Sequence, residues 1–206
     1  MEFWNELVTG KSWEVLLKLR REPVPFTLIG GWAAYLWTRM QKSKDIDIVL
    51  EDHASLEYLK QHFTLKKNDS LRKYEIIVDG IDIDIYVPYF SRLTLPAEDI
   101  GGYSTIVENI RVARPEALLV LKQGAEMDRG DSVKGRKDRL DIMALVLRTE
   151  MDWQLYRELL ERYSLAGHLQ RLRGIVTGFE DIRYLGLNPR EFKLAKGKIA
   201  EIVRHL

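Results

Sequence analysis

The sequence contains no cysteine, and this absence excludes two kinds of site. Without thiols the chain forms neither disulfides nor thiolate metal centres, which is compatible with a reducing cytoplasm. Histidine is also scarce: there are 4, and their positions match no metal-ligand spacing. We therefore interpret the histidines as structural or surface residues, which are His53, His62, His168 and His205.

Long apolar runs and an excess of one charge are missing as well. No segment approaches the ~20 apolar residues of a membrane-spanning helix. The first six residues carry acids where a signal peptide needs lysines. We expect a cytoplasmic protein with no membrane partner. The net charge of +1 gives no global electrostatic case for nucleic-acid binding. Basic residues do cluster from Arg129 to Arg139, although a solvated helix face is the simpler interpretation.

The 206 residues are 46% hydrophobic and 31% charged, a composition typical of a globular protein. Periodicity predicts strands over residues 26–29, 46–50, 63–67, 73–78 and 81–87, with a further strand or hairpin at 105–112. Helices are expected over residues 2–21 (with a break near Gly10), 32–40 and 54–62, and throughout the chain after Pro115. The predicted fold class is α+β. A small mixed β-sheet core flanked by helices covers residues 1–113, and a helical domain covers residues 114–206.

Two adjacent glycines lie between a predicted strand and a predicted helix. Gly30 and Gly31 let a ligand approach the backbone, and the helix that follows directs N–H groups towards a phosphate. We predict that both bind nucleotide and that Gly31 needs a positive φ, although a simple turn is the alternative. The third glycine of the GxGxxG motif is missing, which disfavours a dinucleotide-binding fold.

Paired aspartates occupy two predicted strands. Asp45 and Asp47 alternate with isoleucines, and Asp82 and Asp84 do the same further along the chain. Residues two apart on a strand share a face. Aspartate is a poor strand former, and like charges this close repel each other unless they share a cation. A strand whose aspartates simply face solvent is therefore the less favoured explanation. If the strands are neighbours, the carboxylates converge into an oxygen site for Mg²⁺ or Mn²⁺.

The stretch FTLIGGWAAYLWTRMQKSKDIDIVL, followed by GIDIDI, resembles the nucleotidyltransferases of the DNA polymerase beta superfamily. Within that superfamily it is most similar to the abortive-infection toxins and the minimal nucleotidyltransferases. The resemblance places the third carboxylate at Asp84 and leaves Asp82 as a neighbour. Relatives often carry an arginine shortly before the first aspartate pair. Here that place holds Gln41 and Lys42, with Arg39 nearby.

A second stretch, VARPEALLVLKQGAEMDRGDSVKGRKDRLDIMAL, resembles the later motifs of the same family. It contributes Lys122, Asp138 and Asp141. A surface lysine and ordinary helical ion pairs are the alternative explanations for these residues. The resemblance covers residues 26–147.

The resemblance implies transfer of a nucleoside monophosphate from an NTP to an acceptor hydroxyl, with release of pyrophosphate. It makes Asp45, Asp47 and Asp84 the ligands of Mg²⁺ or Mn²⁺, and these residues together with Lys122 the catalytic set. The nucleotide would be bound by Gly30, Gly31, Lys44 and Asp138. The acceptor could be a tRNA end, a protein side chain or a small molecule, and an antitoxin-like partner is possible. A non-catalytic binding protein and a metal-dependent phosphohydrolase remain as alternatives.

Overall fold

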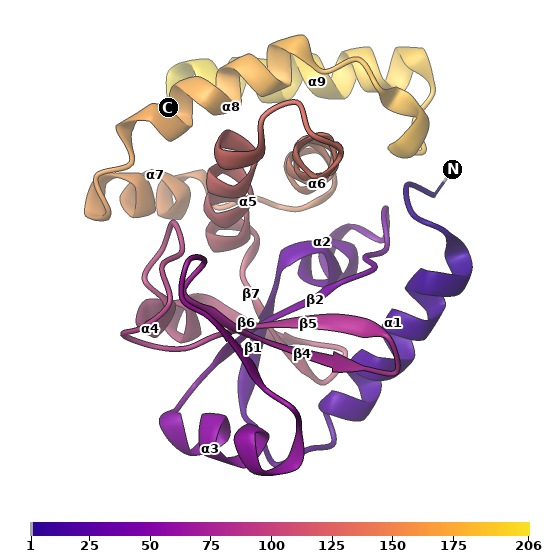
Figure 1. Ribbon diagram of the computed structural model, residues 1–206. Helices are drawn as coiled ribbons and strands as arrows, with labels where there is room; N and C mark the ends of the chain where they lie inside the picture. Colours follow the sequence, from indigo (N-terminus) through magenta and orange to yellow (C-terminus); the bar gives the residue numbers. More distant parts are fainter. Residues whose placement is uncertain (1) are drawn as a thin grey trace.

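The computed structural model describes residues 2–206. Its centre is a seven-stranded mixed sheet in the order β3-β4-β5-β2-β1-β7-β6 (Figure 1). The strands are β1 (Phe26–Ile29), β2 (Ile46–Leu50), β3 (Lys66–Asn68), β4 (Lys73–Val78), β5 (Ile81–Tyr86), β6 (Ser104–Val107) and β7 (Ile110–Ala113). The α+β class expected from the sequence is confirmed.

Helices cover both sides of this sheet. The longer ones are α1 (Glu6–Leu19), α2 (Gly30–Thr38), α3 (His53–His62), α5 (Pro115–Arg129), α6 (Val133–Arg148), α7 (Trp153–Arg162), α8 (Ala166–Gly178) and α9 (Pro189–His205). Short turns form α4 (Ala97–Ile100), η1 (Gly101–Tyr103) and η2 (Ile182–Tyr184). In Figure 1, α2, α5 and α6 lie on one side of the sheet and α3 on the other, while α7 lies beside α5, and α8 and α9 form an outer layer beyond α5 and α6.

The register of the central strands positions the aspartates. Strand β2 runs parallel to β5 and sets Asp47 beside Asp84. Strand β4 runs antiparallel to β5 and sets Glu75 on the other side of Asp84. Along β5 the isoleucines are at most 4% exposed, so the alternating aspartates lie on the opposite face, towards the helices α5 and α6. Apolar burial on one face thus fixes where the acids point.

The helical layer is held to α5 by buried polar groups. Gln123 of α5 accepts a hydrogen bond from the Tyr156 hydroxyl at 2.8 Å and donates one to the His168 carbonyl at 2.7 Å. Glu126, which is fully buried, forms ion pairs with Arg139 and Arg171. These contacts connect α5 with α6, α7 and α8, and they fix the helices that face the sheet.

Several boundaries differ from those expected. Helix α1 runs through Gly10 without a break and begins only at Glu6, because the Asn5 side chain caps it. Helix α2 begins at Gly30, two residues early, and β3 begins at Lys66 instead of residue 63. The turns α4, η1 and η2 were not expected. The division at residue 113 stays a prediction.

Among residues 2–206, no helix combines the length and the apolar character needed to cross a bilayer.

Candidate active site

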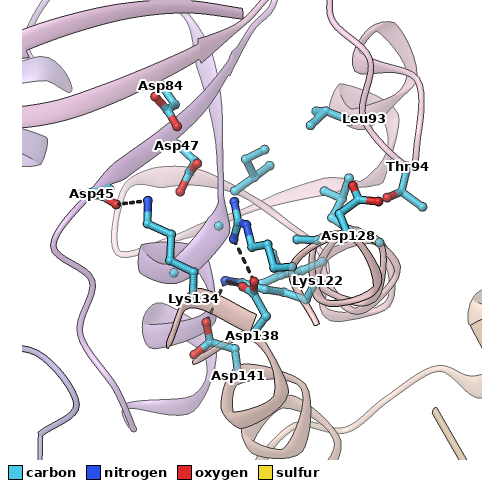
Figure 2. Close-up of a pocket in the computed structure, with 18 of the residues that line it drawn as sticks. Asp45, Asp47, Asp84, Leu93, Thr94, Lys122, Asp128, Lys134, Asp138 and Asp141 are labelled. Carbon is cyan, nitrogen blue, oxygen red and sulfur yellow. Dashed lines mark hydrogen bonds and ion pairs between the residues drawn. The ribbon is translucent and has the colours of Figure 1, made fainter. Parts of the chain in front are cut away.

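A cavity of about 780 Å³ lies between the sheet and the helices α5 and α6 (Figure 2). Asp45, Asp47 and Asp84 line it on the sheet side, and Lys122, Asp138 and Asp141 line it on the helix side. Below, these are the sheet wall and the helix wall. The structure therefore brings the predicted carboxylates and the predicted lysine to one cavity. Asp82 is exposed and does not line it.

The three aspartates of the sheet wall have unequal partners. Asp45 is 3.1 Å from the ammonium of Lys134, and Asp84 is 2.6 Å from the ammonium of Lys73. Within the described chain Asp47 forms no ion pair. Burial and the neighbouring charge of Asp84 raise the pKa of Asp47 to about 7. Burial also raises the pKa of Asp84, although Lys73 opposes the shift. The three carboxylates therefore differ in how strongly their neighbours favour the charged form.

The helix wall is a closed network of buried charges. Lys122 of α5 contacts both Asp138 and Asp141 of α6, at 2.9 and 2.8 Å. Asp138 also pairs with Arg129 at 2.8 Å, and Asp141 with Lys137 at 2.6 Å. Burial alone would lower the pKa of Lys122, but the two aspartates hold it above its usual value. The alternative of ordinary surface charges is wrong, because both aspartates are only 2% exposed.

The glycine turn closes one end of the cavity. Gly30 has a φ of 68°, and a Cβ there would overlap the Asp47 carboxylate. A Cβ on Gly31 would lie 2.6 Å from the Ser43 hydroxyl oxygen. The expectation of a positive φ at Gly31 is wrong, because Gly30 makes the turn from extended Ile29 into α2 and Gly31 is already helical. Both glycines line the cavity, and the N-terminus of α2 opens beside the acids.

Three polar residues before Asp45 lie outside the cavity lining. The Lys44 ammonium is 3.9 Å from Asp45 and lies over the Trp4 ring, 5.0 Å from its centroid. Arg39 pairs with Glu108. Gln41 is buried, accepts a hydrogen bond from the Phe3 amide at 2.8 Å and donates one to the Tyr184 carbonyl at 3.0 Å. Gln41 thus connects two segments that are distant in the sequence. Among the residues predicted to bind nucleotide, Lys44 alone is not on the cavity wall.

Motif reasoning missed several residues of the cavity. Lys73 lies on β4. The only signal in the sequence was its position two residues before Glu75, on the same face of the predicted strand. His168 was assigned a structural or surface position, but it is buried on the cavity wall and its Nε2 has no hydrogen-bond partner within residues 2–206. Burial lowers the pKa of His168, so the imidazole is neutral. Arg129 and Lys134 were predicted only as part of a basic cluster.

The donor chemistry of the sheet wall suits a hard divalent cation. The residues are carboxylates, and Asp47 has no ion-pair partner among the described residues, although the charges of Lys122 and Arg129 oppose the rise of its pKa. As the side chains lie, the described residues contain no group of three or more acids, histidines or cysteines arranged to hold a metal. At two positions lysines pair with these acids, Lys134 with Asp45 and Lys73 with Asp84. Of the three carboxylates, Asp45 and Asp47 suit a cation best, because Lys134 beside Asp45 is 53% exposed whereas Lys73 beside Asp84 is 11% exposed.

Two solved structures share this fold over nearly the whole chain. A Helicobacter pylori protein, described as a proposed nucleotidyltransferase, matches 98% of this chain and 96% of its own, with 16% identity and a TM-score of 0.53. The Helicobacter pylori protein JHP933 matches 98% of this chain and 93% of its own, with 14% identity and a TM-score of 0.51. No protein-family model matches the sequence, and no curated protein matches it significantly. The chain has the fold of nucleotidyltransferase-like proteins.

Proposed function

We propose that the chain is a nucleotidyltransferase that moves a nucleoside monophosphate from an NTP to an acceptor hydroxyl and releases pyrophosphate. The observation that carries the proposal is the register of β2 and β5, which sets Asp47 beside Asp84 on one cavity wall. The helix wall with Lys122 faces them across the cavity (Figure 2). Gly30 and Gly31 line the same cavity. The abortive-infection class within this fold rests on the sequence motifs alone.

In this proposal the triphosphate lies at the N-terminus of α2, where Gly30 and Gly31 admit it. The helix dipole and free N–H groups there attract anions. Lys122 and Arg129 neutralise phosphate charge as it develops, and Asp138 holds both of them in place. The acceptor oxygen forms a bond to the α-phosphorus while the bond to pyrophosphate breaks. We assign Asp84 to accept the proton of the acceptor hydroxyl.

Asp45 and Asp47 are the groups that would hold Mg²⁺ or Mn²⁺, and the sequence resemblance adds Asp84, which is paired with Lys73 in this structure. When bound, a divalent cation polarises phosphate oxygens and neutralises charge on the attacking and leaving oxygens. The raised pKa of Asp47 supports this assignment, because a cation at this position would relieve the repulsion between neighbouring carboxylates.

For the acceptor we propose an RNA end such as that of a tRNA. A second cavity, of about 850 Å³, adjoins the first, and Trp4 lines both. Its wall includes four arginines and three further aromatic residues, which are Arg136, Arg139, Arg171, Arg183, Phe3, Phe179 and Tyr184. Aromatic rings and arginines together suit unpaired bases and phosphates. Among these arginines Arg136 is exposed and forms no ion pair within the described chain.

The test is to incubate the protein with each labelled NTP and Mg²⁺ or Mn²⁺, with and without tRNA, and to follow the label. We expect label on the RNA, and none with Asp47→Asn. Asp82→Asn is the matched control, because Asp82 lies on β5 but outside the cavity. Label on a protein or a small molecule would keep the chemistry and replace the acceptor. Nucleotide binding without transfer to any acceptor would favour the non-catalytic alternative.

For the RNA acceptor, Lys134→Gln with Arg136→Gln should weaken tRNA binding and reduce its salt dependence. Each lost phosphate contact changes the slope by about 0.7 on single strands. No tRNA affinity of the wild type at low salt would eliminate RNA as the acceptor.

A further inference from the structure

A lysine occupies the sheet wall at the position of the third carboxylate. The Lys73 side chain is 11% exposed, and its ammonium lies 2.6 Å from Asp84 and 3.1 Å from Glu75. Glu75 lies directly across from Asp84 in the sheet and also accepts a hydrogen bond from the Asn68 amide at 3.0 Å. Lys73 is therefore fixed between two carboxylates on adjacent strands.

The second lysine of the sheet wall is held quite differently. Lys134 projects from α6 towards Asp45, and its side chain is 53% exposed (Figure 2). It leaves Asp45 by rotating into solvent, without exposing a buried charge. Lys73 has no comparable freedom, because its departure would leave Glu75 and Asp84 facing each other without a counter-ion. A divalent cation at Asp84 would have to lie against the Lys73 ammonium, which repels it.

We propose that Lys73 is a built-in cation that occupies, beside Asp84, the place where a metal ion would otherwise bind. The site then binds one divalent cation, at Asp45 and Asp47, and Lys73 is a positioning residue for the Asp84 carboxylate. This inference rests on the proposed function for its meaning in catalysis. Its physical content concerns only how many cations the chain binds, and this number is measurable without nucleotide or acceptor.

The experiment is a Mn²⁺ titration of the full chain without nucleotide, with free Mn²⁺ followed by electron paramagnetic resonance. We expect one Mn²⁺ per wild-type chain. Binding should weaken at least tenfold in Asp47→Asn and change little in Asp84→Asn. In Lys73→Met a second Mn²⁺ should bind, and it should disappear when Asp84→Asn is added.

Two matched variants control for the loss of a lysine. Lys73→Arg keeps a cation between the same carboxylates and should bind one Mn²⁺. Lys134→Met removes the mobile lysine and should also bind one, more tightly than the wild type. Circular dichroism establishes that each variant is folded, and if Lys73→Met is not, the wild-type and Asp84→Asn titrations decide alone.

Three results would overturn the proposal. They are two Mn²⁺ in the wild type with one lost in Asp84→Asn, a single Mn²⁺ in folded Lys73→Met, and no Mn²⁺ in the wild type. None of these depends on transfer activity. A failed labelling experiment with one bound Mn²⁺ would refute the proposed function and leave the role of Lys73 in cation binding intact.

Discussion

The aspartates on the two walls of the cavity have opposite electrostatic surroundings. On the helix wall, burial is matched by cations, because Asp138 and Asp141 share contacts with Lys122, Arg129 and Lys137. On the sheet wall, half-buried Asp47 lies beside Asp84 and has no ion-pair partner among residues 2–206, and its pKa rises to about 7. The buried aspartates of one wall are thus matched by cations of the protein, whereas Asp47 on the other wall is not.

The largest effect that should follow from this difference is on transfer. Asp47→Asn removes the unpaired carboxylate with little change in shape. We expect the rate of nucleotidyl transfer to fall at least ~10³-fold. The Asp47 carboxylate would hold the cation that stabilises charge developing in the transition state. Asp45→Asn should behave similarly. Turnover near the wild-type level in either variant would remove both residues from the site.

The same Asp→Asn change on the helix wall should act on stability. Asp141 is the only ion-pair partner that the described residues give Lys137, which is 5% exposed. Asp141→Asn should therefore lower the free energy of unfolding by about 3 kcal/mol, because a buried ammonium loses its counter-ion. Urea denaturation measures this value. An unchanged unfolding midpoint would mean that Lys137 does not depend on Asp141 as its counter-ion.

A smaller effect separates the two aspartates of β5. Asp84→Asn should reduce the transfer rate by about 10²-fold, in line with loss of one group that acts in the transition state. Asp82→Asn should change the rate much less, because Asp82 lies outside the cavity. Single-turnover rates at saturating NTP make the comparison. If Asp82→Asn proved the more damaging, the roles of the two residues would have to be exchanged.

A further consequence of the difference between the walls is a dependence of stability on pH. The pKa of Asp47 is raised from 3.8 to about 7, so the folded chain holds this proton to higher pH than the unfolded chain. The contribution of Asp47 to stability is thus most favourable below pH 4 and is lost as the pH rises towards 7. Without metal, the free energy of unfolding of Asp47→Asn should therefore exceed that of the wild type at pH 8. This advantage should largely vanish at pH 4. Urea denaturation with EDTA at both pH values provides the test, and an equal difference at both would refute it.

The sequence was informative where the signal is local. Strand periodicity placed Asp45 and Asp47 on one face, and the apolar pattern of β5 placed Asp84 opposite its isoleucines. The pairing of β2 with β5 could only be assumed from the sequence, because it joins segments separated by α3, β3 and β4.

Lys73 and Lys134 could not be assigned to the site from the sequence, for the same reason. Each lysine belongs to an ordinary strand or helix, and only the tertiary structure brings its ammonium to an aspartate. The positive φ of Gly30 was misplaced by one residue, because two adjacent glycines are equally able to make the turn and only the position of Asp47 distinguishes them.

Trp4 gives the site an optical reporter of its own. Its indole ring lines both cavities and lies under the Lys44 ammonium, whereas Trp32 is buried against Ser12 in the core. Indole emission depends on nearby charge and on exposure to water. Filling either cavity should change the fluorescence of Trp4 more than that of the core tryptophans, and Trp4→Phe should abolish most of the change. Ligand binding could then be followed in real time on the unlabelled protein.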